Sequence, residues 1–264
     1  MQGILQKIQV HVPFYLLREK LLPWAIREGI NPEIAFGHYD LDRFQAADFR
    51  ETAERLADAG LLATLHAPFM DLRPGALDPR IRQTSLDRLR RVFDLIPWFK
   101  PRSVVCHASF DEKYYVSAEA LWLENSLATW RTLLGCIRGT GTIIALENVY
   151  ERDPRLLKRL LDELASPQVR FCLDTGHANV FGGVPLGLWI EALGDLLGEI
   201  HIHDNHGTAD EHLPVGEGNV PFRELFAMVR GRNLKPILTV ESHSEKGLRR
   251  MLENLQAMEL PERS

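Results

Sequence analysis

The chain has 264 residues, of which 45% are hydrophobic, 25% charged and 8% aromatic, and its 31 basic and 36 acidic residues give a net charge of −5. These proportions are typical of globular proteins and exclude disordered, collagen-like and fibrous chains. The acidic balance disfavours nucleic acid as a partner, although a local basic groove stays compatible with it. The arginine-rich stretch Arg80–Arg91 is interpreted as a solvated helix face.

The cysteines and the N-terminus narrow the class of protein further. Cys106, Cys136 and Cys172 are too few and too scattered for a disulfide framework or a cysteine zinc site. Cys106 and Cys172 lie in apolar runs, so we interpret them as buried free thiols. No signal-peptide pattern and no membrane span of roughly 18 apolar residues is found. We therefore expect a soluble, cytoplasmic protein.

Eight short apolar runs recur along the chain. Their nearly continuous apolarity is typical of parallel strands that are covered on both faces. The predicted strands are Ile4–Val12, Glu33–Phe36, Leu61–His66, Ser103–His107, Thr142–Glu147, Val169–Asp174, Glu199–His203 and Pro236–Glu241.

Amphipathic stretches lie between these runs. The predicted helices are Asp48–Ala59, Pro79–Phe99, Ala118–Ile137, Asp153–Leu164 and Phe222–Val229. Gly60 suits the position just beyond a helix C-terminus, and Asp153 followed by Pro154 suits an N-cap and a first turn. Eight strand–helix units in about 250 residues predict a single (β/α)₈ barrel over residues 1–264. A doubly wound open sheet is less favoured, because no G-x-G-x-x-G follows the first run.

The residues that end the runs carry the functional signal. In order they are His11, Phe36, His66, His107, Glu147, Asp174, His201 and Glu241. A barrel gathers the carboxyl ends of its strands at one face, so these side chains are expected to converge there. Three carboxylates buried together would repel one another unless cations compensate. His11 by itself is interpreted as a hydrogen-bonded rim residue.

The loops after the last strands add further ligand types. His177 follows Asp174 by three residues, and Gly176 is expected to allow the turn between them. Asp210 and His212 are expected to face inward from an extended loop. The segment Gly216–Gly218 is interpreted as a flexible edge of the pocket.

Together these positions predict a multinuclear metal site. The candidate ligands are His66, His107, Glu147, Asp174, His177, His201, Asp210, His212 and Glu241. They exceed what one ion with about four to six ligands can use. Two to three divalent ions fit better, and imidazole with carboxylate indicates zinc, manganese or iron.

Several motifs resemble the xylose-isomerase-like TIM-barrel superfamily, which includes endonuclease IV and sugar phosphate isomerases and epimerases. They are Leu65–Pro68, Leu146–Asn148, Leu173–His177, His201–Asn205 and Asp210–Gly218. Likeness to endonuclease IV implies three zinc ions on the nine ligands above, whereas likeness to the epimerases implies one ion on Glu147, Asp174, His201 and Glu241. The chain departs from endonuclease IV at Phe69, where that enzyme has tyrosine, and lacks a clear equivalent of its DNA-inserting loops.

The leading hypothesis is metal-assisted hydrolysis of a phosphoester, with a sugar phosphate or another small phosphorylated substrate favoured over duplex DNA. Glu147, Glu241 and His203 are the expected catalytic residues, and His203 is expected, with His206, to contact substrate or support the ligands. The alternative is a sugar or polyol isomerase or epimerase in which Glu147 and Glu241 form the acid/base pair. A non-catalytic binding barrel is the third hypothesis.

Overall fold

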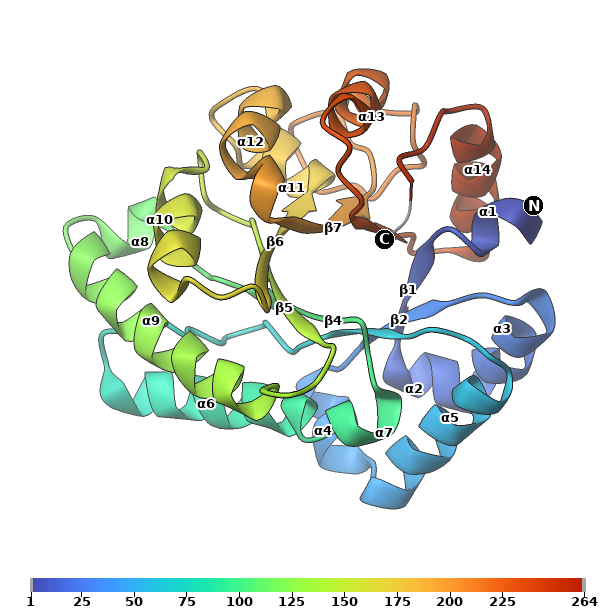
Figure 1. Ribbon diagram of the computed structural model, residues 1–264, viewed down its shortest axis with the longest axis horizontal. Coiled ribbons are helices and arrows are strands. Elements are labelled where there is room, and N and C mark those ends of the chain that lie inside the picture. The colour runs from blue at the N-terminus through green and yellow to red at the C-terminus, as the bar shows by residue number, and fades with distance from the viewer. Residues whose placement is uncertain (1, 263–264) are drawn as a thin grey trace.

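Within residues 2–262, which the computed structural model describes, eight parallel strands close a barrel in the order β1 to β8. Figure 1 shows these strands as an inner ring with the helices around it. The strands are β1 (Gln9–Pro13), β2 (Pro32–Ala35), β3 (Thr64–His66), β4 (Ser103–His107), β5 (Ile143–Glu147), β6 (Val169–Asp174), β7 (Leu197–Ile202) and β8 (Ile237–Val240). The predicted (β/α)₈ fold is confirmed.

The long helices cover the outer face of the barrel, and short ones occupy its loops. They are α1 (Gln2–Leu5), α2 (Phe14–Leu16), η1 (Leu17–Leu21), α3 (Leu22–Glu28), α4 (His38–Arg43), α5 (Ala46–Asp58), α6 (Pro79–Phe93), α7 (Ile96–Phe99), α8 (Glu112–Tyr115), α9 (Glu119–Cys136), α10 (Arg155–Leu164), α11 (Thr175–Val180), α12 (Leu186–Leu193), η2 (Gly194–Leu196), α13 (Phe222–Gly231) and α14 (Glu245–Gln256). None of those found in residues 2–262 is long and apolar enough to cross a bilayer.

Three predicted elements are wrong in extent, and one of them is the third strand, which begins at Thr64 rather than Leu61. The first strand begins at Gln9 rather than Ile4, because Gln2–Leu5 forms the helix α1. Ile4 and Leu5 are buried, and a short apolar run cannot by itself tell a buried helix from a strand. The predicted helix Pro79–Phe99 is interrupted between α6 and α7. Pro97 stands just after this break, where its ring and missing N–H prevent a continuous helix.

Of the two predicted helix ends, one is confirmed and the other is wrong. Gly60 follows the C-cap of α5 with a φ of +69°, as the left-handed position after a helix requires. The predicted N-cap Asp153 is wrong, because Pro154 stands at the N-cap of α10. The Asp153 carboxylate instead accepts a hydrogen bond from the backbone N–H of Arg155 at 2.9 Å.

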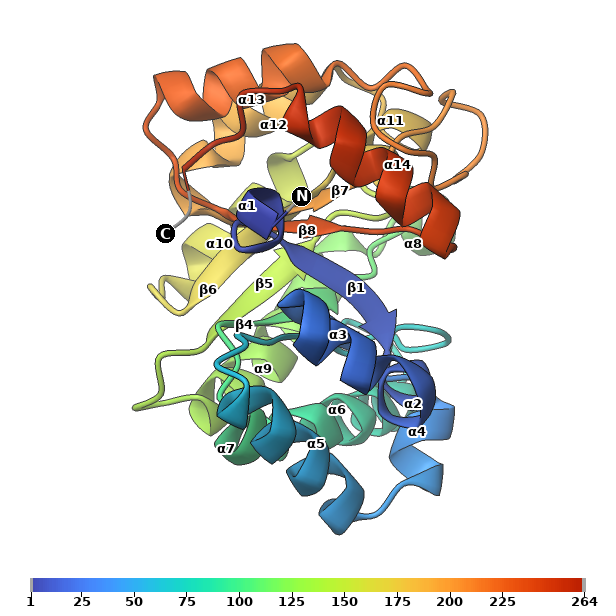
Figure 2. The same cartoon turned by 90° about the vertical axis from the view of Figure 1, so that its right-hand side faces the viewer.

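The polar side chains at the strand ends share one side of the barrel because every strand runs the same way. Figure 2 shows the arrows of β1 and β8 pointing to the same side. Beneath this end, Val105, Ala145 and Cys172 form a small apolar cluster inside the barrel. Cys106 and Cys172 are buried free thiols, as predicted, and burial raises the pKa of both.

The arginine-rich stretch lies on α6, as its interpretation as a helix face required. Arg88 and Arg91 both bond to Asp42, at 2.5 and 2.6 Å. These two arginines therefore have an acidic partner on the same surface. Exposed pairs of this kind add little to stability.

Candidate metal centre

The structure brings all nine predicted ligands together at the carboxyl end of the barrel. Seven come from strands β3 to β7 or from the residues just after a strand, and the loop after β7 supplies Asp210 and His212. Most of them are buried or nearly so. Three of the ligand-competent groups are built only from predicted site residues: His66 with His107 and Glu147, Asp174 with His177 and His203, and His203 with His212 and Glu241.

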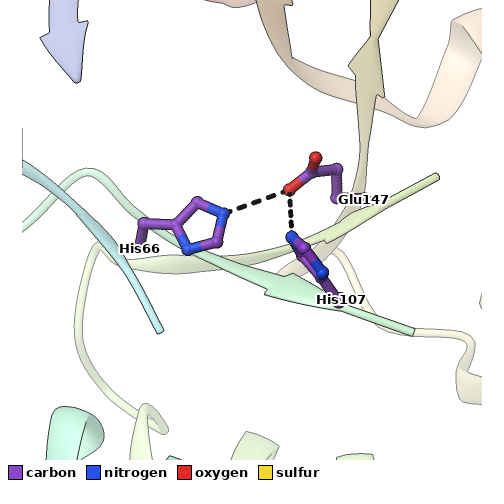
Figure 3. A group of neighbouring side chains, drawn as sticks. All are labelled: His66, His107 and Glu147. Atoms are coloured by element: carbon purple, nitrogen blue, oxygen red, sulfur yellow. Dashed lines mark hydrogen bonds and ion pairs between the residues drawn. The ribbon is translucent and has the colours of Figure 1, made fainter. Parts of the chain in front are cut away.

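The first group gathers around one oxygen of Glu147. The Nε2 atoms of His66 and His107 each lie 3.2 Å from Glu147 Oε2, and Figure 3 shows both imidazoles directed at that atom. His66 has its other nitrogen, Nδ1, 2.8 Å from the carbonyl oxygen of Ala67. A bond of this kind fixes the tautomer and leaves Nε2 to face a ligand.

Glu147 also faces the second group through its other oxygen. Its Oε1 lies 3.0 Å from Nδ1 of His177, which follows β6. The same oxygen lies 3.8 Å from Nδ1 of His201, so the two oxygens of Glu147 face two different pairs of histidines. This is the arrangement expected of a carboxylate that bridges two ions.

The second group is organised by the start of α11. Asp174 is the N-cap of this helix, and its Oδ1 accepts the backbone N–H of His177 at 2.7 Å. Nε2 of His203 lies 3.0 Å from both oxygens of Asp174. Gly176 was expected to allow the turn between Asp174 and His177, and that turn is the first turn of α11. A Cβ at Gly176 would lie 2.0 Å from the His203 ring, so close packing requires glycine there.

The third group comes from the loop after β7. His212 has Nδ1 3.4 Å from Glu241 Oε2 and Nε2 3.2 Å from Asp210 Oδ2. Its ring stacks on His203 with the ring centroids 3.9 Å apart. The predicted inward orientation of Asp210 and His212 therefore agrees with the structure.

The loop that carries Asp210 and His212 is held by Asp204. One carboxylate oxygen of Asp204 accepts the N–H groups of Gly216 and Gly218 at 2.8 and 3.0 Å. The other accepts the N–H groups of Asn205 and Val220 at 2.9 and 3.0 Å. Segment Gly216–Gly218 was expected to be a flexible edge, and this is wrong because its backbone is anchored to a buried carboxylate.

Three buried imidazole nitrogens support the presence of a cation. Among the described residues, no group lies in hydrogen-bond geometry with the Nδ1 atoms of His201, His203 and His212, although acids lie near them. A buried polar atom without a partner is costly and is rare in folded proteins. His201 Nδ1 lies 2.9 Å from Glu241 Oε1 and 3.8 Å from Glu147 Oε1. A lone pair directed among carboxylates fits a divalent ion held by nitrogen and oxygen donors.

The electrostatics of the centre follow from its alternating acids and imidazoles. Burial alone would raise the pKa of Glu147 and Glu241, but the surrounding histidines outweigh burial and hold both well below the usual range. Burial would lower the pKa of His177 and His201, but the neighbouring acids raise both well above 6.5. Without an ion, the imidazoles supply the positive charge that these carboxylates require.

The centre opens into a cavity of about 580 Å³ that is lined by seven of the nine predicted ligands. Asp174 and His201 lie deeper and are fully buried. His203, predicted as a catalytic residue, is also fully buried and does not line this cavity, so its geometry fits a ligand or a supporting residue better than contact with substrate. His206 is exposed and bonds to Glu211 at 2.9 Å.

Sequence reasoning did not identify Glu33 as a site residue, and it interpreted His11 only as a hydrogen-bonded rim residue. His11 is hydrogen-bonded as predicted, with Nδ1 2.9 Å from Glu33 Oε1, and it also lies 3.4 Å from Glu241. Glu33 is fully buried inside the barrel. A charged residue within an otherwise apolar predicted strand was the available signal. His243, whose ring centroid lies 4.2 Å from that of His212, was missed as well.

The chain is similar to one family of barrel proteins over most of its length. A family described as xylose isomerase-like TIM barrel matches residues 31–259. An uncharacterised protein of Methanocaldococcus jannaschii is 27% identical over 187 residues, which cover 67% of this chain and 63% of that protein, less than two thirds of its length. A probable endonuclease 4 of Mycobacterium leprae is 25% identical over 199 residues, covering 71% of this chain and 76% of that protein.

Solved structures show the same fold. A D-tagatose 3-epimerase-like protein superposes with a TM-score of 0.78 at 22% identity, covering 95% of this chain and 96% of that one. At this level of identity the likeness concerns the fold.

Proposed function

Because the chain belongs to the xylose isomerase-like TIM barrel family, we propose that it is a divalent-metal-dependent enzyme that hydrolyses a small phosphoester. The observation that carries the proposal is the placement of Glu147, whose Oε2 faces His66 and His107 while its Oε1 faces His177. A carboxylate placed between two sets of ligands favours two to three ions over one.

The residues that would hold the ions are the nine predicted from the sequence, with His203 added because it belongs to two of the three ligand-competent groups. Zinc, manganese or iron fits this donor set. Bound there, such ions supply positive charge for a phosphoryl group and acidity for a water nucleophile. Glu147 and Glu241 would hold the ions, and either carboxylate could orient the attacking water.

The walls of the cavity favour a small anionic substrate. Among the described lining residues, Arg73 is the one lysine or arginine, and its guanidinium carbon lies 5.4 Å from the ring centroid of Tyr114. A guanidinium fixed on an aromatic face suits a phosphate. Phe69 stacks on His107 with the ring centroids 4.4 Å apart and covers one face of that imidazole.

A second candidate function, isomerisation or epimerisation of a sugar, is favoured by the position of Glu241. Its Oε1 lies 2.9 Å from His201 Nδ1, and Glu147 Oε1 lies 3.8 Å from the same atom. Two glutamates on either side of one ligand position could exchange a proton with a substrate between them. In that reaction His66, His107, Asp210 and His212 would bind hydroxyl groups.

Metal counting and a substrate screen separate the two functions. The protein is reconstituted with zinc, manganese or iron, its bound ions are counted by elemental analysis, and it is assayed with phosphoesters and ketoses. We expect two to three ions per chain and phosphate release. One ion per chain together with ketose turnover would favour the epimerase function.

The variant Glu147→Gln tests both schemes. We expect it to lose at least one ion and more than the roughly 100-fold in activity that outer-shell changes cost. Full metal content with full turnover would contradict both functions. Glu163→Gln, on the exposed side of α10, is the matched control and should change neither quantity.

A further inference from the structure

Glu33 lies on β2 beneath the proposed centre and contacts two imidazoles at once. Its Oε1 is 2.9 Å from His11 Nδ1, and its Oε2 is 3.3 Å from His201 Nε2. Oε2 also accepts a hydrogen bond from the Thr64 hydroxyl at 3.4 Å. Glu33 and His201 are both fully buried, so water does not compete for these contacts.

These contacts belong to a closed cycle of four side chains. From Glu33 it passes to His201, whose Nδ1 lies 2.9 Å from Glu241 Oε1. It returns through His11, whose Nδ1 lies 3.4 Å from Glu241 Oε1 and 2.9 Å from Glu33 Oε1. Because each member touches two others, a change at Glu33 affects both His201 and the orientation of Glu241.

The two nitrogens of His201 have different surroundings. Nε2 faces Glu33, whereas Nδ1 has no hydrogen-bond partner among the described residues and lies among Glu241, Glu147 and Asp174. A neutral imidazole carries a proton on one of its two nitrogens, and only the nitrogen without the proton can bind an ion. A carboxylate that accepts a hydrogen bond from Nε2 keeps the proton on that nitrogen, and Nδ1 is then the nitrogen that can bind an ion.

We infer that Glu33 is a positioning residue that keeps the proton of His201 on Nε2 and thereby presents Nδ1 to the ion. This role rests on the proposed metal-dependent function. Glu33 is placed outside the ligand set because both of its oxygens already face imidazoles, and outside substrate contact because it does not line the cavity.

Glu199 offers a matched comparison in the same barrel interior. It is equally buried, and Glu33, Glu199 and His201 each place one atom within 4.8 Å of the others. Both of its oxygens are occupied by hydroxyl groups, from Ser103 and from Thr239, each at 2.6 Å. Glu199 therefore shares the burial of Glu33 without accepting a bond from an imidazole.

The test compares Glu33→Gln with Glu199→Gln. An amide has a single acceptor oxygen, so the side chain of Glu33→Gln cannot accept from both His11 and His201. We expect Glu33→Gln to bind cobalt(II) and zinc 10–100-fold more weakly and to change the visible absorption spectrum of the cobalt form. Glu199→Gln should bind within about twofold of the unaltered chain with an unchanged spectrum. A folded Glu33→Gln variant with unaltered affinity and spectrum would overturn the role of Glu33.

A second measurement needs no variant. In the zinc-loaded, ¹⁵N-labelled chain, the nitrogen shifts of His201 are expected to show the proton on Nε2. A proton on Nδ1 would overturn the inference even if Glu33→Gln failed to fold. A chain that binds no divalent ion would overturn the proposed function itself, which separates that failure from a failure of this role alone.

Discussion

Arg73 illustrates how one side chain at the cavity can select a substrate. It stands in the loop after β3, and its guanidinium is held over Tyr114. The deep part of the cavity is dense in carboxylates, so an anionic substrate depends on the ions and on this guanidinium for attraction. A charge-assisted hydrogen bond is worth about 1.5–3 kcal/mol.

We expect Arg73→Ala to raise the KM for a phosphorylated substrate by roughly 10-fold or more and to change kcat little, because the lost bond acts on the bound and reacting states alike. Steady-state kinetics measures this split. Arg80→Ala, on exposed α6, is the control. An unchanged KM for Arg73→Ala would remove this arginine from substrate recognition.

Gly176 shows how a ligand can be positioned by the absence of a side chain. We expect Gly176→Ala to lower the free energy of unfolding by roughly 1–3 kcal/mol, because the new methyl group would overlap the His203 ring. Metal affinity should fall with it. Gly135→Ala on α9 has open space around its Cβ and should be neutral or slightly stabilising. Equal thermal stability of the two variants would contradict this account.

The loop after β7 behaves as one element because it is tied to a single side chain. Asp204 fixes the backbone on both sides of Asp210 and His212 through four N–H groups. The same residue pairs with Leu213 through two backbone hydrogen bonds. The loop therefore holds Asp210 and His212, the two ligands proposed from it, in one backbone conformation.

We expect Asp204→Ala to release this loop while the barrel stays folded. Backbone amides of residues 205–220 should exchange faster with deuterium, and at least one ion should be lost, because Asp210 and His212 leave their positions. Hydrogen-exchange mass spectrometry and metal analysis check both. Glu211→Gln removes an exposed carboxylate from the same loop and should leave metal content unchanged. Normal protection of the loop in Asp204→Ala would refute the anchoring role.

At the scale of the whole molecule, ion binding and folding should be coupled. An ion that binds the folded chain and not the unfolded one stabilises it by about 2.7 kcal/mol at a concentration 100 times its Kd. For a chain of this length that is about 5 °C or more in Tm. We expect chelation to lower Tm by this amount, and calorimetry with and without chelator measures it. An unchanged Tm in a chain that had bound ions would contradict the coupling.

Glu151 links two loops of the barrel mouth and makes stability depend on pH. Its oxygens accept the backbone N–H groups of Phe110 and Val149 at 3.2 and 2.7 Å. Burial raises its pKa to about 7 from 4.5, more than these bonds lower it. The folded chain therefore retains a proton that the unfolded chain loses between about pH 4.5 and 7.

A rise in pH removes the stabilisation that comes from Glu151. The contribution of Glu151 is fully present below about pH 4.5 and is lost as pH rises through 7, with a total of roughly 3 kcal/mol. We expect the free energy of unfolding of the metal-free chain to fall more steeply over this range than that of Glu151→Gln. Denaturant titrations at several pH values measure both slopes. Parallel slopes would show that Glu151 is ionised in the folded chain.

The sequence by itself determined the barrel and most of the side chains that meet at its carboxyl end. Eight apolar runs at regular spacing predicted the strands, and the ionisable residue that ends most of them predicted which side chains would meet. This works because parallel strands share a direction, so strand ends that are distant in the chain lie together once the barrel closes. Local patterns also placed Gly60 correctly, because a left-handed residue after a helix is a local requirement.

The tertiary structure decided what local patterns could not. Ile4 and Leu5 belong to a helix although their spacing also fits a strand, because their burial in the core depends on contacts across the fold. Gly176 is glycine because of the ring of His203, which follows another strand. Glu33 matters because closure of the barrel places it between His11 and His201. These facts depend on contacts between residues far apart in sequence, and such contacts exist only after the chain has folded.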